Sequence, residues 1–161
     1  MPSWNEIENQ INKEIIFLSR NIIPSPYRQD DFIKCDDCIF RQIAVLVVSG
    51  KIKMTKIVYA NNEIWQENKY TKSLTSRKQH GAFWHDSLIR IIENYFNQNK
   101  HKTELEPAMY YGRADLGIPF LNLFIEAGTI NLYKLRNNLI NMADCRIIVV
   151  PEDNYFIEFN L

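Results

Sequence analysis

Apolar side chains recur every three or four residues in three segments of the chain, a spacing that predicts amphipathic helices. The first segment covers residues 4–19, and Ser3 is placed to cap that helix. The second begins at Phe83 and fades at residues 97–100, and the third follows Thr129, a second candidate cap. The apolar positions are Trp4, Ile7, Ile11, Ile15 and Leu18 in the first, Trp84, Leu88, Ile91, Ile92, Tyr95 and Phe96 in the second, and Leu132, Leu135, Leu139, Met142 and Ala143 in the third.

Other segments carry shorter apolar runs that predict strands. EPAMYYGRADLGI (106–118) and LNLFIEAG (121–128) are expected to be strands joined by a bend at residues 117–119. CRIIVVP (145–151) is almost continuously apolar, as in a buried central strand, and NYFIEFNL (154–161) is expected to form an edge strand. The second half of the chain therefore reads helix, two or three strands, helix, strand, an order that predicts an α/β sandwich with a mixed sheet.

The first half of the chain is less clearly patterned. Residues 38–66 fit either two strands joined at residues 49–51 or a helix followed by a wing-like hairpin. Residues 67–81 are polar without an apolar stripe and are expected to connect the two halves. We therefore expect residues 1–81 to form a helical or mixed extension and residues 82–161 to form the α/β core, with one compact domain overall as the other option.

Composition narrows the class of protein. The chain has 161 residues, 46% hydrophobic and 24% charged, which is typical of a globular domain with a real core. It contains no apolar run of about 18 residues, so no membrane span is expected. The polar N-terminus has no apolar centre of a signal peptide, and three cysteines do not suggest a disulfide framework, so a cytoplasmic protein is expected.

Charge is balanced overall but not along the chain. The formal net charge is +0, whereas residues 51–102 contain ten lysines and arginines against four acids. This basic band could face phosphates, or it could be ordinary solvated loops and helix faces. Within it, aromatic and basic residues alternate at Trp65, Lys69, Tyr70, Lys72 and Arg77, a composition compatible with base stacking and also with a solvated connection.

Two acids lie in the predicted strands before and after the bend. If the strands pair as a hairpin, Asp115 and Glu126 lie close together at one end of it. Hard divalent cations such as Mg²⁺ often bind one or two carboxylates together with water and phosphate. The pair therefore predicts a metal site, and the alternative is that Asp115 ends a strand while Glu126 faces solvent.

The surroundings of these acids resemble the PD-(D/E)XK nuclease superfamily. The sequence D-x10-E-A-G at residues 115–128 is preceded by an amphipathic helix and followed by a helix and an apolar strand. That family's core is helix, three strands, helix, strand, with acids from the second strand and from an E-x-K triplet in the third. The resemblance covers about residues 82–151. It implies a restriction-endonuclease-like three-layer core, with a mixed central sheet flanked by helices. It also implies that Asp115 and Glu126 bind Mg²⁺, or Mn²⁺ as a substitute, assisted by the carbonyl of Ala127.

The chain departs from the family at one position. Gly128 stands where the triplet usually has its lysine, a cation that offsets negative charge developing during hydrolysis. Superfamily members can supply this cation from the following helix, where Lys134 is the nearest candidate, although its helical position falls away from the apolar stripe. Arg113 is the other candidate, because period-two alternation puts it on the strand face of Asp115.

The helix before the strands offers two further polar groups. The family often adds an acid from this helix, and Glu93 is its only glutamate, placed at the border of the buried face. A solvated glutamate is the alternative. His85 projects into the apolar arc, where a histidine is usually a hydrogen-bonded core residue, although it could reach the site from the helix start.

By resemblance, the expected activity is Mg²⁺-dependent hydrolysis of DNA phosphodiester bonds, with RNA as a further possible substrate and a homodimer as a possible assembly. The rival expectation is a nucleic-acid-binding or assembly protein that kept the fold and lost the catalytic lysine. A less favoured expectation is structural Zn²⁺ at the C-x2-C pair Cys35 and Cys38 together with His80 and His85, since zinc accepts two thiolates and two imidazoles.

Overall fold

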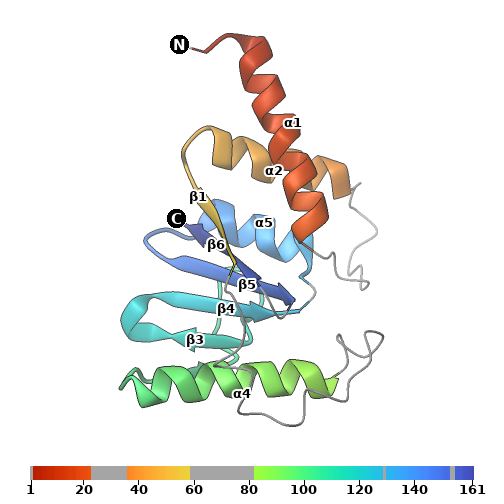
Figure 1. The fold of residues 1–161 in the computed structure, drawn as a ribbon. Helices are drawn as coiled ribbons and strands as arrows, with labels where there is room; N and C mark the ends of the chain where they lie inside the picture. Colours follow the sequence, from red (N-terminus) through yellow and green to blue (C-terminus); the bar gives the residue numbers. More distant parts are fainter. Residues whose placement is uncertain (1, 23–35, 59–81, 129, 153–154) are drawn as a thin grey trace.

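The computed structural model describes residues 2–22, 36–58, 82–128, 130–152 and 155–161 (Figure 1). Within these ranges the protein has a six-stranded sheet in the order β1-β6-β5-β4-β3-β2. β4 and β5 pair in parallel, and the other neighbours are antiparallel. The strands are β1 (Lys53–Val58), β2 (Glu104–Leu105), β3 (Leu116–Ile118), β4 (Leu123–Ala127), β5 (Arg146–Glu152) and β6 (Tyr155–Asn160). The predicted mixed α/β class is confirmed.

Helices cover both faces of the sheet (Figure 1). α4 (Ala82–Gln98) packs on one face, where Trp84 and Leu88 meet buried residues of β3 and β4. α5 (Leu132–Asn141) lies on the other face together with α2 (Asp36–Val48), and α1 (Trp4–Asn21) packs on α2. α5 also connects β4 to the parallel strand β5. β3 and β4, the strands next to the candidate acids, pack on α4, whereas the side chain of Glu126 meets Lys134 of α5.

The helix starts follow local capping chemistry. Ser3 and Glu6 form a capping box at α1, in which Ser3 N–H donates to Glu6 Oε2 at 2.6 Å and Glu6 N–H donates to Ser3 Oγ at 3.4 Å. This confirms the predicted cap. At α5 the cap is Asn131, whose Oδ1 accepts from Lys134 N–H at 3.0 Å. Thr129, the residue expected there, lies outside the described residues.

The ambiguous segment 38–66 contains a helix followed by a strand. α2 covers most of the run that could also have been a strand, so the two-strand option was wrong, and residues 59–66 lie outside the described part of the chain. β1 pairs with β6 from Lys53↔Asn160 to Val58↔Tyr155. β6 is consequently an interior strand, not the edge strand expected from sequence. Alternation of apolar residues shows which face of a strand is buried, but not whether its hydrogen-bonding edge is paired.

The hairpin of β3 and β4 is shorter than the sequence suggested. Before β3 the chain makes a turn at Gly112, with φ of 79° and Met109 N–H donating to the Gly112 carbonyl oxygen at 3.0 Å. After β3 a 3-10 turn, Pro119–Leu121, leads into β4. Asp115 therefore stands at a bend just before β3 and not inside a long strand. Among the described residues, no helix is long and apolar enough to cross a membrane.

Candidate functional site

The β3–β4 hairpin brings the two predicted acids together at its open end. Leu116 pairs with Ile125, and Asp115 N–H donates to the Ile125 carbonyl oxygen at 3.1 Å. The Asp115 side chain then reaches the next strand, where Oδ2 accepts from Ala127 N–H at 2.7 Å. This bond fixes the Asp115 carboxylate against the strand that carries Glu126.

Glu126 is a buried carboxylate with one nearby cation. Its residue is only 6% exposed, and Lys134 Nζ lies 2.6 Å from Oε1. The pKa of Glu126 is raised from 4.5 to about 7, mainly by burial and in part by the charge of Asp115, while the charge and hydrogen bond of Lys134 oppose the rise. At 2.6 Å the Lys134 ammonium is within hydrogen-bond distance of Oε1, and it is the main group that compensates the burial of this carboxylate.

Lys134 is the cation that the fold brings to the acids. It lies in the first turn of α5, its Nζ also donates to the carbonyl oxygen of Arg113, and its side chain is 19% exposed. Its stem crosses Gly112, where an added Cβ would be 3.6 Å from Lys134 Cε. The helical projection placed Lys134 off the apolar stripe, but that projection locates the Cβ and not the end of a long side chain.

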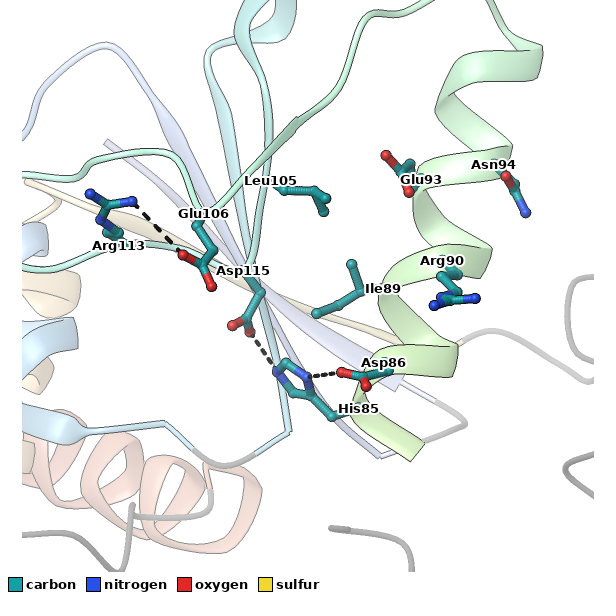
Figure 2. A pocket seen from close by; sticks show the side chains of 10 residues that line it. All are labelled: His85, Asp86, Ile89, Arg90, Glu93, Asn94, Leu105, Glu106, Arg113 and Asp115. Carbon is teal, nitrogen blue, oxygen red and sulfur yellow. Dashed lines mark ion pairs between the residues drawn. The ribbon is translucent and has the colours of Figure 1, made fainter. Parts of the chain in front are cut away.

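Arg113, the other cation considered, does not face Asp115 or Glu126. Its side chain is 68% exposed, and Nη1 lies 3.8 Å from Glu106 Oε2 (Figure 2). The alternation that put Arg113 beside Asp115 holds only along a regular strand, and the chain bends at Asp115 before β3 begins.

Gly128 adopts a backbone conformation that disfavours the family's lysine. Its φ is 83°, in the left-handed region, and its N–H donates to the Val150 carbonyl oxygen at 2.8 Å. A Cβ at this position would lie 3.3 Å from Cζ3 of Trp84. The backbone conformation at the end of β4 therefore favours glycine over lysine at residue 128.

His85 lies beside Asp115 at the start of α4. The helical pattern favoured a hydrogen-bonded core residue and gave contact with the site as the alternative. Nε2 lies 3.3 Å from Asp115 Oδ2, and Nδ1 lies 3.6 Å from Asp86 Oδ1 (Figure 2). The bond to Asp115 is the main cause of a raised pKa of His85, and burial of the ring opposes it. The buried position in this turn is taken by the neighbouring Trp84, which is 5% exposed.

An open cleft of about 800 Å³ lies beside these residues, with α4 as one wall and the chain around β2 and Arg113 as the other. Asp115 and His85 lie at one end of it (Figure 2). Glu93 also lines the cleft, but it is about two helical turns beyond His85 and accepts from Thr103 Oγ1 at 3.4 Å. Glu93 is therefore not gathered with Asp115 and Glu126.

The donor set suits a hard cation better than zinc. Asp115 and Glu126 supply carboxylate oxygens, the atoms that Mg²⁺ prefers. In the part of the chain that the structure describes, no three His, Cys, Asp or Glu side chains gather as a complete ligand set. Of the four residues considered for zinc, Cys35 and His80 lie outside the described residues, Cys38 is exposed and His85 faces two aspartates. Zinc binding therefore stays a prediction. Base stacking by the aromatic and basic segment 65–77 also stays a prediction, because that segment lies outside the described residues.

Chemically, the site combines two adjacent carboxylates, one partly buried ammonium and one imidazole, of which Asp115 and His85 line the open cleft. Such a set can bind a divalent cation, hold a phosphate oxygen and transfer a proton. Comparisons of the chain with protein-family models, with curated proteins and with solved structures find no match.

Proposed function

We propose that the protein is a metal-dependent nuclease of the PD-(D/E)XK type, which hydrolyses phosphodiester bonds of DNA. The observation that carries the proposal is the meeting of three side chains from separate elements. Asp115 is fixed on Ala127 N–H at 2.7 Å, and Lys134 Nζ lies 2.6 Å from Glu126 Oε1. Two acids and one lysine are the functional groups of that family's site, here with the lysine supplied by α5.

The arrangement of elements supports the same proposal. α4, β2, β3, β4, α5 and β5 follow one another as helix, three strands, helix, strand, the order named for the family. The three strands pair in sequence and antiparallel, and β5 adds in parallel beside β4. A restriction-endonuclease-like core is thus the finer fold assignment that we propose within the mixed α/β class.

In this proposal, Asp115 and Glu126 hold Mg²⁺, with His85 near enough to Asp115 to orient it. A bound divalent cation stabilises charge on a phosphate and lowers the pKa of water. Lys134 places a positive charge where the scissile phosphate gains negative charge, a contribution worth about 100- to 1000-fold in rate for comparable preorganised groups. For Mg²⁺ to bind, Glu126 would share its carboxylate between the ion and Lys134, and Asp115 would share its carboxylate between the ion and His85.

The test is cleavage of supercoiled plasmid and of labelled single strands by the full chain with Mg²⁺ or Mn²⁺. Asp115→Asn and Glu126→Gln should abolish cleavage and also the rise in Tm that a bound metal causes. Lys134→Gln should lower the rate by about 100- to 1000-fold while the metal-dependent Tm shift persists. Glu158→Gln is the matched control, because it removes a carboxylate paired with Arg146 at 3.4 Å on a different part of the sheet.

A non-catalytic nucleic-acid-binding or assembly protein is the second candidate, and one observation favours it. Each acid already has a basic side chain beside it, His85 at 3.3 Å from Asp115 and Lys134 at 2.6 Å from Glu126, as in a site stabilised without metal. If the wild-type protein binds DNA or RNA but shows neither cleavage nor a metal-dependent Tm, the second candidate replaces the nuclease. A dimer, which would allow two strands to be cut, is measured by sedimentation.

A further inference from the structure

An aromatic cluster lies at the opposite end of α4 from His85. Tyr95, Phe96, His101 and Phe120 follow one another in space, with ring centroids 5.4, 6.1 and 5.8 Å apart. The last pair, His101 and Phe120, is stacked with an interplanar angle of 27°. Phe120 is 83% exposed, so the face of its ring that His101 does not cover is open to solvent. The cluster therefore ends in a flat, accessible aromatic face.

Phe120 is held in this exposed position by its turn. Pro119 fixes the start of the 3-10 turn, and Asn122 N–H closes it on the Pro119 carbonyl oxygen at 3.0 Å. Arg146 N–H donates to the Asn122 carbonyl oxygen at 2.9 Å, and the Asn122 side chain donates to the carbonyl oxygen of Asp144. Phe120 is therefore a large apolar side chain that its turn holds in solvent, where one face of the ring is accessible to a ligand.

The partner side of the stack is equally fixed. α4 ends with Lys100 at φ of 64° and His101 N–H donating to the Phe96 carbonyl oxygen at 2.9 Å, the geometry of a Schellman motif. The His101 ring is thereby placed between Phe96 and Phe120. Lys100 and Lys102, both exposed, flank His101 in sequence. An accessible aromatic face stacked on a residue that two exposed lysines flank in sequence matches a nucleic acid strand, whose bases stack and whose phosphates are anionic.

We propose that Phe120, supported by His101, is a stacking platform for a base of single-stranded nucleic acid, whose phosphates meet Lys100 and Lys102. The proposal names the substrate form and rests on the nuclease function proposed above. Bases of a duplex are stacked on one another and expose few faces, whereas an unpaired strand can place a base on the free side of Phe120.

The platform and the candidate site lie at opposite ends of α4. Figure 1 shows the C-terminal end of α4 and the β3–β4 turn at the same side of the molecule, with the start of α4 at the other. His85 and Tyr95 are ten positions apart, about 15 Å along the helix. The cleft runs from Asp115 to Glu93, which bonds Thr103, two residues from His101.

Binding of a fluorescently labelled oligo(dT) to the full chain, measured by anisotropy in EDTA, tests the platform apart from cleavage. Phe120→Ala should weaken binding about fivefold to 150-fold, the range for loss of one stacked base. Phe120→Trp should keep or strengthen binding, and Phe120→Leu should weaken it like alanine, because leucine is apolar but cannot stack. Trp4→Ala, which removes a 72% exposed aromatic from α1, is the matched control and should leave binding unchanged.

The charges and the partner class are tested with the same material. Lys100→Gln combined with Lys102→Gln should make the logarithm of affinity fall less steeply with the logarithm of salt, by about 1.4 in slope for two phosphates. A duplex of the same length should be bound without dependence on Phe120.

The outcomes separate the two proposals. Equal oligo(dT) affinity of wild type and Phe120→Ala overturns the platform, and so does a Phe120 effect seen only on self-association in sedimentation. Phe120-dependent binding without cleavage by any metal supports the platform and removes the nuclease. Cleavage without Phe120-dependent binding supports the nuclease and overturns the platform.

Discussion

Replacement of Glu126 by glutamine should stabilise the folded protein at alkaline pH while it removes the proposed metal site. The pKa of Glu126 is about 7 in the folded protein, against an ordinary value of 4.5. Folding is therefore favoured by this group below pH 4.5, and that contribution is lost as the pH rises to about 7 and beyond. At about 1.4 kcal/mol for each pH unit, the cost of ionised Glu126 reaches about 3 kcal/mol. Glutamine does not ionise and so avoids this cost. The gain is reduced by the free energy that Lys134 loses when its anionic partner is removed.

Urea unfolding of wild type and Glu126→Gln between pH 4.5 and 8.5 measures this effect. The two proteins should be nearly equal at pH 4.5 and differ by up to about 3 kcal/mol at pH 8.5, equivalent to a Tm higher by about 6–12 °C for a chain of this size. Glu158→Gln, the ion-paired control, should show no gain. If Glu126→Gln is no more stable than wild type at pH 8.5, Glu126 ionises without cost and the reasoning from its burial is refuted.

Three further changes probe the same site. Lys134→Ala leaves the buried Glu126 carboxylate without its cation, so we expect a loss of about 3–5 kcal/mol at pH 8.5 and a smaller loss at pH 5, read from urea midpoints. Gly128→Lys restores the family's usual residue but places it at φ of 83°, so it should lower stability by about 1–3 kcal/mol in urea unfolding and leave cleavage no faster; a stable, faster enzyme would contradict this. His85→Gln removes a histidine whose pKa is raised mainly by Asp115, a stabilisation present below the ordinary pKa and lost as pH rises. The variant should therefore be less stable than wild type near pH 6 and nearly equal to it at pH 9; a constant difference would argue against this assignment.

The sequence predicted best where the signal is local. The Ser3 cap and the apolar stripes of α1, α4 and α5 involve residues three or four positions apart, and these elements were confirmed. The pairing of Asp115 with the strand of Glu126 was also predictable, because a short hairpin leaves few registers.

What failed depends on contacts between distant residues. The pairing of β6 with β1 joins positions about 100 residues apart, and no pattern within the sequence of β6 predicts it. The choice between Lys134 and Arg113 was likewise decided by tertiary geometry. α5 brings the Lys134 side chain to Glu126, and the bend at Asp115 turns Arg113 away. No local sequence signal distinguishes the two cations.

The place of β1 in the sheet bears on how the protein can be divided. β1 supplies the hydrogen-bonding partners for one whole side of β6, from Tyr155 to Asn160. A fragment that starts at residue 82 would leave that side bare, along a strand whose Ile157 and Phe159 are fully buried in the intact protein. Unpaired edges of apolar strands recruit other chains. β1 therefore protects the edge of β6 from pairing with other chains, and the candidate site is best studied with this strand in place.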